Sequence, residues 1–124
     1  NPASAMRVLG FAKIPKMLKK GICVSIGTDG ASANNRMTMV DEMYVTSLIH
    51  KGWRLDPTVV KAEEIITMAT TNGAKALLWE DEIGALKPGM KADLIIINPD
   101  SAAMLPIHDP IANIVTAMHE SNYV

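Results

Sequence analysis

Apolar and polar positions along the first part of the chain change their spacing at Gly21. Residues 11–20 place their apolar side chains at helical spacing with lysines opposite, which predicts an amphipathic helix ended by that glycine. The run 22–27 that follows is short, rich in β-branched residues and bounded by glycine. Such a run predicts a strand buried on both faces, of the kind found in parallel sheets.

Two longer helices are predicted beyond the polar loop at 28–38. Residues 39–51 carry apolar side chains at roughly helical spacing, with Gly52 at the end, and 61–79 form a second candidate. Gly73 within it costs roughly 1 kcal/mol relative to alanine, so we expect a kink or a close helix contact there. The order of helix, strand, loop and two helices suits the end of an α/β unit.

The pattern changes again at 83–100. Lys-Pro-Gly at 87–89 predicts a turn, and the apolar run 92–97 predicts a strand of a different, antiparallel sheet that stops at the Asn-Pro pair 98–99. The tail 101–124 contains two prolines and is expected to be an irregular covering loop.

Composition narrows the function classes. The chain has 124 residues, is 48% hydrophobic and carries a net charge of −1, without a basic tract. Binding of nucleic acid or of an anionic membrane therefore has no electrostatic basis. No apolar stretch approaches the ~20 residues of a membrane-spanning helix.

The single cysteine, Cys23, is expected to be buried, which fits a cytoplasmic location. A start without methionine and an end without a polar tail suggest a piece of a longer polypeptide.

A carboxylate stands just beyond the predicted strand 22–27. Asp29 would lie at the carboxyl end of a parallel strand, where α/β folds assemble their sites. A carboxylate there is costly unless it is hydrogen-bonded or binds a cation. Asp29 could equally accept hydrogen bonds from the amides of residues 31–34 as a turn or helix cap. The small polar residues 31–35 could line a pocket or form a plain solvent loop.

The histidines and serines do not complete a site by themselves. His50 is expected on the surface of its helix, and His108 and His119 lack the spacing of a metal-binding pair. Ser4 and Ser32 have no base near them in sequence and are discounted as nucleophiles.

Three stretches nevertheless resemble one known family. Gly-Ile-Cys-Val-Ser-Ile-Gly-Thr-Asp-Gly and the following residues to 43 resemble the last barrel strand and loop of the amidohydrolase superfamily. The closest similarity is to its cytosine-deaminase-like branch, which includes methylthioadenosine/S-adenosylhomocysteine deaminases, guanine deaminases and triazine hydrolases. Residues 1–9 resemble the segment after the preceding strand. Residues 69–98 resemble the passage into a small β-sandwich, with Gly84, Lys-Pro-Gly at 87–89 and Ala-Asp-Leu at 92–94 as the most distinctive pattern.

The resemblance implies an α/β fold: the C-terminal end of a (β/α)₈ TIM-type barrel at 1–80, then part of a β-sandwich with a covering loop at 81–124. In the family, the aspartate that ends the eighth strand approaches the metal and exchanges a proton with the hydrolytic water. Asp29 fills that position and is therefore expected to be both the catalytic and the metal-facing residue. Asp93 belongs to the sandwich hairpin and is expected to be structural.

The implied activity is that of a metal-dependent hydrolase or deaminase, with Zn²⁺ or, as second choice, Fe²⁺. It would remove an amino, chloro or alkylamino substituent from a small heterocyclic substrate such as a purine or triazine. The resemblance also implies a homo-oligomer. Two features depart from the family: Ala5 stands where asparagine is usual, and the histidine ligands and catalytic glutamate are absent from 1–124. The alternative is a non-catalytic α/β module, or an inactive fragment, in which Asp29 is only a cap.

Overall fold

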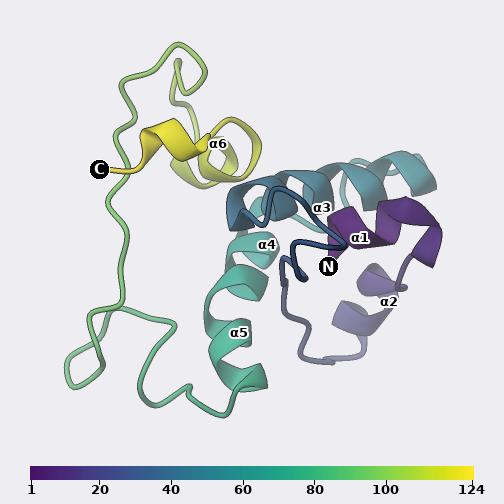
Figure 1. Cartoon of the computed structure of the whole chain (residues 1–124), viewed down its shortest axis with the longest axis horizontal. Helices are drawn as coiled ribbons and strands as arrows, with labels where there is room; N and C mark the ends of the chain where they lie inside the picture. The colour runs from purple at the N-terminus through teal and green to yellow at the C-terminus, as the bar shows by residue number, and fades with distance from the viewer.

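The structure, a computed structural model, describes the backbone of residues 1–124 and every side chain except that of Val8. Short helices surround one long helix, and a long loop extends away from them between α5 and α6 (Figure 1). The elements are α1 (Pro2–Ser4), the π-helical turn η1 (Ala5–Leu9), α2 (Ile14–Lys19), α3 (Met39–Arg54), α4 (Ala62–Ala69), α5 (Thr71–Ala76), α6 (Pro110–Thr116) and the 3₁₀ turn η2 (Glu120–Asn122).

The core lies where α3, α4 and α6 pack against one another. Val40 and Met43 face it from α3, Ile65 and Met68 from α4, and Val115 from α6, each 6% exposed or less. Burial of such side chains from three helices is the main source of stability for short helices. The helix predicted at 39–51 is confirmed.

The run 22–27 does not form a strand, because no second segment pairs with it in the described part of the chain. The amide of Ile26 donates instead to the carbonyl oxygen of Met68 over 3.0 Å, and the Val24 carbonyl accepts from Asn72 Nδ2 over 2.9 Å. Only one side of the run is therefore covered: Val24 is buried, whereas Cys23 is exposed. The prediction that Cys23 is buried is wrong for this reason.

The helix predicted at 61–79 is divided in two. The break lies at Thr70, with φ −124° and ψ −93°, and separates α4 from α5. Gly73 lies inside α5, and a β-carbon added there would meet nothing within 4 Å. The expected irregularity therefore exists, but Gly73 neither causes it nor makes a close helix contact.

The loop between α5 and α6 contains the turn at 87–89 that the sequence predicts. Met90 donates its amide to the Lys87 carbonyl over 3.1 Å, and Gly89 has φ 89°. The strand predicted at 92–97 is not formed; a single antiparallel bridge joins Ile97 to Tyr123. The β-sandwich, and with it the division into 1–80 and 81–124, stays a prediction.

The tail is more regular than expected. Asp109 Oδ1 accepts from the amides of Ile111 and Ala112, at 2.9 and 3.2 Å, and so caps α6, which begins at Pro110. Proline at the first helical position loses no intrahelical hydrogen bond, so Asp-Pro begins this helix. Across the described residues, helices of the length and apolar character needed to cross a membrane are absent.

Candidate functional site

Asp29 lies on the exposed loop after 22–27, with its backbone in the left-handed region at φ 63°. Aspartate tolerates this conformation better than most residues, and such positions cluster at functional sites. Its Oδ1 accepts from the Gly30 amide over 2.7 Å, and its Oδ2 accepts from the Ser4 hydroxyl over 2.9 Å. The Gly30 amide first, and the Ser4 hydroxyl second, lower the pKa of Asp29 below its ordinary value of 3.8. The side chain is therefore an exposed carboxylate, ionised at neutral pH.

The amides beyond Asp29 follow a different pattern from the one the capping alternative requires. Those of Ala33 and Asn34 donate to the carbonyl oxygen of Gly30, at 3.0 and 2.9 Å. This loop is thus closed by its own backbone rather than by the carboxylate.

Ser4 belongs to this site, although sequence reasoning discounted it as a nucleophile. It is only 2% exposed, and α1 brings its hydroxyl to Asp29 from 25 residues away in sequence. The hydroxyl donates a hydrogen bond to the ionised carboxylate and so orients the side chain of Asp29.

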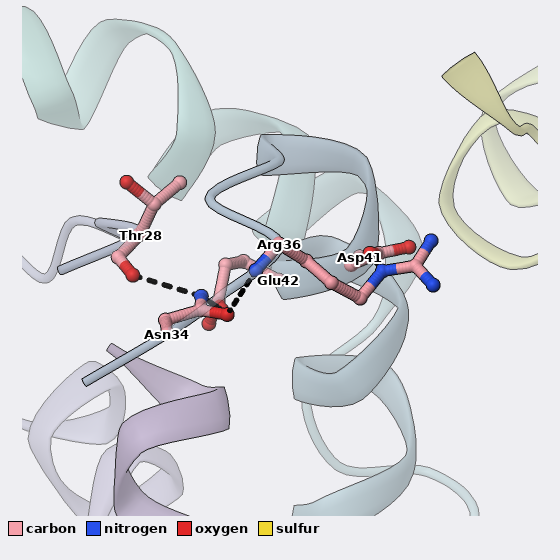
Figure 2. Close-up of polar contacts among 5 residues, drawn as sticks. All are labelled: Thr28, Asn34, Arg36, Asp41 and Glu42. Carbon is pink, nitrogen blue, oxygen red and sulfur yellow. Dashed lines mark hydrogen bonds and ion pairs between the residues drawn. The ribbon is translucent and has the colours of Figure 1, made fainter. Parts of the chain in front are cut away.

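A buried polar cluster supports the same loop from behind. Asn34 Nδ2 donates to the Thr28 carbonyl over 2.8 Å and to Glu42 Oε1 over 2.5 Å (Figure 2). Glu42, in the first turn of α3, is fully buried, and its Oε2 accepts from the Ala3 amide over 3.0 Å. The sequence singled out neither Asn34 nor Glu42. Both hydrogen-bond donors to the Glu42 carboxylate lie outside α3, the helix that carries Glu42.

A second acid in the same turn of α3 turns to the surface. Asp41 forms an ion pair with Arg36, whose side chain is 71% exposed, whereas the neighbouring Glu42 points inward (Figure 2). Exposed pairs of this kind contribute little to stability, typically about 0–1 kcal/mol.

The prediction that His50 lies at the surface is wrong. It is 6% exposed on the inner side of α3, and the Arg54 guanidinium lies 3.1 Å from its Nδ1. Burial, and then the charge of Arg54, lower the pKa of His50 below its ordinary value of 6.5. His108 and His119 are both exposed and join no common site with it.

The residues that the structure describes do not by themselves form a complete site for a catalytic metal. Within the described residues, no group of three or more His, Cys, Asp or Glu side chains could hold an ion. Catalytic zinc typically takes three protein ligands and a water. Asp29 can supply one such contact, so the remaining ligands of any metal would have to come from elsewhere.

An apolar groove of about 440 Å³ lies between η1 and the second half of α3. Phe11 and Trp53 border it, with their ring centroids 5.5 Å apart. Its lining holds no His, Cys, Asp or Glu side chain, so it is not a candidate for hydrolysis.

Residues 3–122 match the amidohydrolase family, and the chain belongs to this family. It is 46% identical over 123 residues to a 5-methylthioadenosine/S-adenosylhomocysteine deaminase of Acetivibrio thermocellus, covering 98% of this chain and 28% of that protein. An adenosine deaminase of Xanthomonas campestris with bound zinc gives a TM-score of 0.94 at 27% identity, covering 98% of this chain and 28% of that one. An atrazine chlorohydrolase of Arthrobacter aurescens TC1, complexed with zinc, gives a TM-score of 0.87 at 27% identity. The match covers 98% of this chain and 27% of the chlorohydrolase chain.

These similarities confirm the family resemblance and its connection to both deaminases and a chlorohydrolase. The chain has the fold of the corresponding part of the solved amidohydrolases, as expected. It spans about 28% of the length of the curated relatives it matches.

Proposed function

We propose that this chain is part of a metal-dependent amidohydrolase in which Asp29 is the proton-transferring residue. The whole enzyme would remove an amino, or less often a chloro or alkylamino, substituent from a nitrogen heterocycle by hydrolysis. In this proposal the segment 22–27 is the last strand of the barrel and Asp29 stands at its mouth. The observation that carries the proposal is the exposed, ionised carboxylate of Asp29, oriented by Gly30 and Ser4.

The role of Asp29 follows from the state of its side chain. An ionised carboxylate can accept a proton from the water that attacks the ring carbon and return it to the departing amine. Each oxygen of Asp29 already accepts one hydrogen bond, so the side chain has a preferred orientation while lone pairs remain available. Its exposure leaves room for water and substrate.

We propose Zn²⁺ as the metal of the whole enzyme, with Fe²⁺ as second choice. Both solved structures named above carry zinc. When bound, zinc supplies a water of lowered pKa, about 7 instead of 15.7. Its other ligands would lie outside this chain, because the described residues include no group of three or more His, Cys, Asp or Glu side chains that could hold an ion.

Deamination of a purine-type substrate is the first choice. A relative at 46% identity is named as a deaminase of 5-methylthioadenosine and S-adenosylhomocysteine. Triazine hydrolysis is second, since the chlorohydrolase gives the lower TM-score of the two solved structures.

We also propose a cytoplasmic location and a homo-oligomeric parent enzyme that binds neither nucleic acid nor membrane. The free thiol of Cys23 and the net charge of −1 support the location and the partner class. The homo-oligomer rests on the family resemblance.

Replacing Asp29 by Asn tests the proposal in the full-length enzyme that contains this chain. Asparagine keeps the shape and one acceptor oxygen for the Gly30 amide, and its NH₂ group can donate to the Ser4 hydroxyl oxygen, but it has lost the basic carboxylate. We therefore expect kcat to fall by about 10²–10⁴-fold, the range typical of positioned acid–base groups. Turnover is measured on aminopurines and triazines, with zinc content and melting temperature determined for the same samples.

Asp56→Asn is the matched control. Asp56 is another aspartate whose pKa is lowered by local bonds, here from the hydroxyl and amide of Thr58. The control should keep wild-type turnover. If Asp29→Asn turned over as fast as Asp56→Asn on every substrate the wild type accepts, the alternative of a purely structural Asp29 would be correct.

A further inference from the structure

The chain segments on both sides of the Asp29 site are bonded to one buried carboxylate, that of Glu42. From this geometry we infer that Glu42 is a positioning residue: it holds α1 and the loop 28–34 in the arrangement that aims Asp29. This inference rests on the proposed function of Asp29 and names a further residue of the same site.

Burial makes Glu42 unusual among the acids of the chain. Its side chain is fully inaccessible, and carboxylates are almost never fully buried unless they are paired. Removing a charge from water is costly unless hydrogen bonds replace the lost hydration. Each oxygen of Glu42 has one such donor, and both donors belong to other segments.

The first of these segments carries Ser4. Glu42 Oε2 accepts from the amide of Ala3 over 3.0 Å, and the next residue, Ser4, donates its hydroxyl to Asp29 Oδ2 over 2.9 Å. Ser4 is itself buried, so its hydroxyl has few other positions. Glu42 thus sets the place of α1, and α1 sets the place of the hydroxyl.

The second segment carries Asp29 itself. Glu42 Oε1 accepts from Asn34 Nδ2 over 2.5 Å, and the same amide group donates to the carbonyl of Thr28 over 2.8 Å (Figure 2). Thr28 directly precedes Asp29 in the chain. Asn34 is 4% exposed, so Glu42 holds the loop through a buried link.

Asp29 depends on such support because it is exposed and its own backbone is in a conformation that costs energy. A non-glycine residue at φ 63° persists only where the surrounding structure holds it there. Without Glu42 the bonds from the Ala3 amide and the Asn34 side chain are lost, and the bond between Ser4 and Asp29 is left to hold the loop against α1 without this support. A displacement of about 1 Å at a reacting group can cost about 10²-fold in rate.

Glu42→Gln is the principal variant, tested in the same full-length enzyme. A glutamine keeps the shape but offers one acceptor and one donor, so its NH₂ group must face either the Ala3 amide or the Asn34 amide group. We expect kcat to fall by about 10–100-fold, with KM within about threefold of wild type and unchanged zinc content.

Asp41→Asn is the matched control. It removes the same charge from the same turn of α3, so any effect through the helix dipole is shared. Its partner Arg36 is on the surface. We expect turnover within about twofold of wild type.

A double-mutant cycle with Asp29→Asn separates positioning from general destabilisation. If Glu42 acts through Asp29, adding Glu42→Gln to Asp29→Asn lowers kcat no further, because the group being aimed is already lost. A further drop equal to that of Glu42→Gln alone would show a merely structural role and overturn the inference.

The outcomes for the two proposals are distinct. Wild-type turnover by Glu42→Gln beside an impaired Asp29→Asn refutes the positioning role and leaves the proposed function standing. Wild-type turnover by Asp29→Asn refutes the proposed function and the inference with it. If Glu42→Gln does not yield folded protein, Asn34→Ala replaces it in the same cycle, because it removes the link to the loop and leaves Glu42 bonded to Ala3. An additional drop in kcat on the Asp29→Asn background, equal to that of Asn34→Ala alone, overturns the inference, and no additional drop supports it.

Discussion

At the scale of single residues, the low pKa of Asp29 comes from neighbouring donors and not from burial. Asp56 shows that this feature is not a mark of function by itself, since the amide and hydroxyl of Thr58 have the same effect there. What distinguishes Asp29 is a left-handed backbone and a partner, Ser4, that is distant in sequence and buried. These two features are properties of tertiary structure.

His50 gives a prediction about pH. Because its pKa is lowered in the folded protein, the unfolded chain binds a proton first as the pH falls below about 6.5, and protonation favours unfolding. The free energy of unfolding is therefore fully retained above that pH and decreases as the pH falls toward the lower folded pKa. In the full-length enzyme, we expect His50→Gln to flatten the decline of melting temperature between about pH 7.5 and 5.

The same replacement at His108 is the control for that experiment. His108 is exposed on the loop before α6, so His108→Gln should leave the pH dependence of the melting temperature as in wild type. If the melting temperatures of the wild type and His50→Gln declined in parallel as the pH fell, protonation of the buried His50 ring would not be a cause of the decline.

At this scale, the sequence predicted Asp29 but not the residues around it. The position of Asp29 follows from an apolar run and a family motif, which are local in the chain. Ser4 meets Asp29 across 25 residues, and Ala3 meets Glu42 across 39. Periodicity contains no information on such contacts, so Glu42 could be read only as a helical acid near a positive helix end.

At the scale of elements, Gly84 fixes the start of the long loop against α5. A β-carbon at this position would lie 2.8 Å from Ala74 Cβ and 3.2 Å from Thr71 Cα, and its φ of 91° already excludes most residues. The chain can therefore pass α5 this closely only with glycine.

We expect Gly84→Ala to lower stability more than Gly89→Ala. Both glycines have φ near 90°, so both substitutions should incur strain of about 1–3 kcal/mol, but nothing lies within 4 Å of a β-carbon at Gly89. Urea unfolding of the two full-length variants measures the difference. Equal midpoints would show that the close contact with α5 is relieved without cost.

The elements themselves differ in how far the sequence could predict them. The helices at 14–19 and 39–54 are found because a helix satisfies its hydrogen bonds within itself. Strands need a neighbour. In the described chain the run at 22–27 has none, and the run at 92–97 is paired with Tyr123 at Ile97 alone. The helix at 110–116 was missed because its proline was interpreted as a helix breaker, although Asp109 before it is a good cap.

At the scale of the whole molecule, many large apolar side chains remain exposed. Leu78 is 84% exposed, Leu86 70% and Ile95 63%, all on or beside the long loop. Exposure of this extent is unusual for a protein that acts alone and indicates surfaces that need a partner or further chain.

Residues 1–124 expressed by themselves should therefore aggregate or oligomerise, and should carry no zinc after dialysis. The apolar surfaces drive the association, and the lack of a cluster of three metal ligands among the described residues explains the second expectation. Size-exclusion chromatography with light scattering and metal analysis provide the measurements. A monodisperse monomer with stoichiometric zinc would contradict both.

The exposed thiol of Cys23 has a practical consequence. It is the only cysteine of the chain, and it lies on the outer side of the segment that leads to Asp29. Its rate of alkylation therefore measures whether that side is covered, without any substitution. A thiol that reacts quickly in residues 1–124 and slowly in the full-length enzyme would report, in a single kinetic trace, that the rest of the enzyme has closed over this segment.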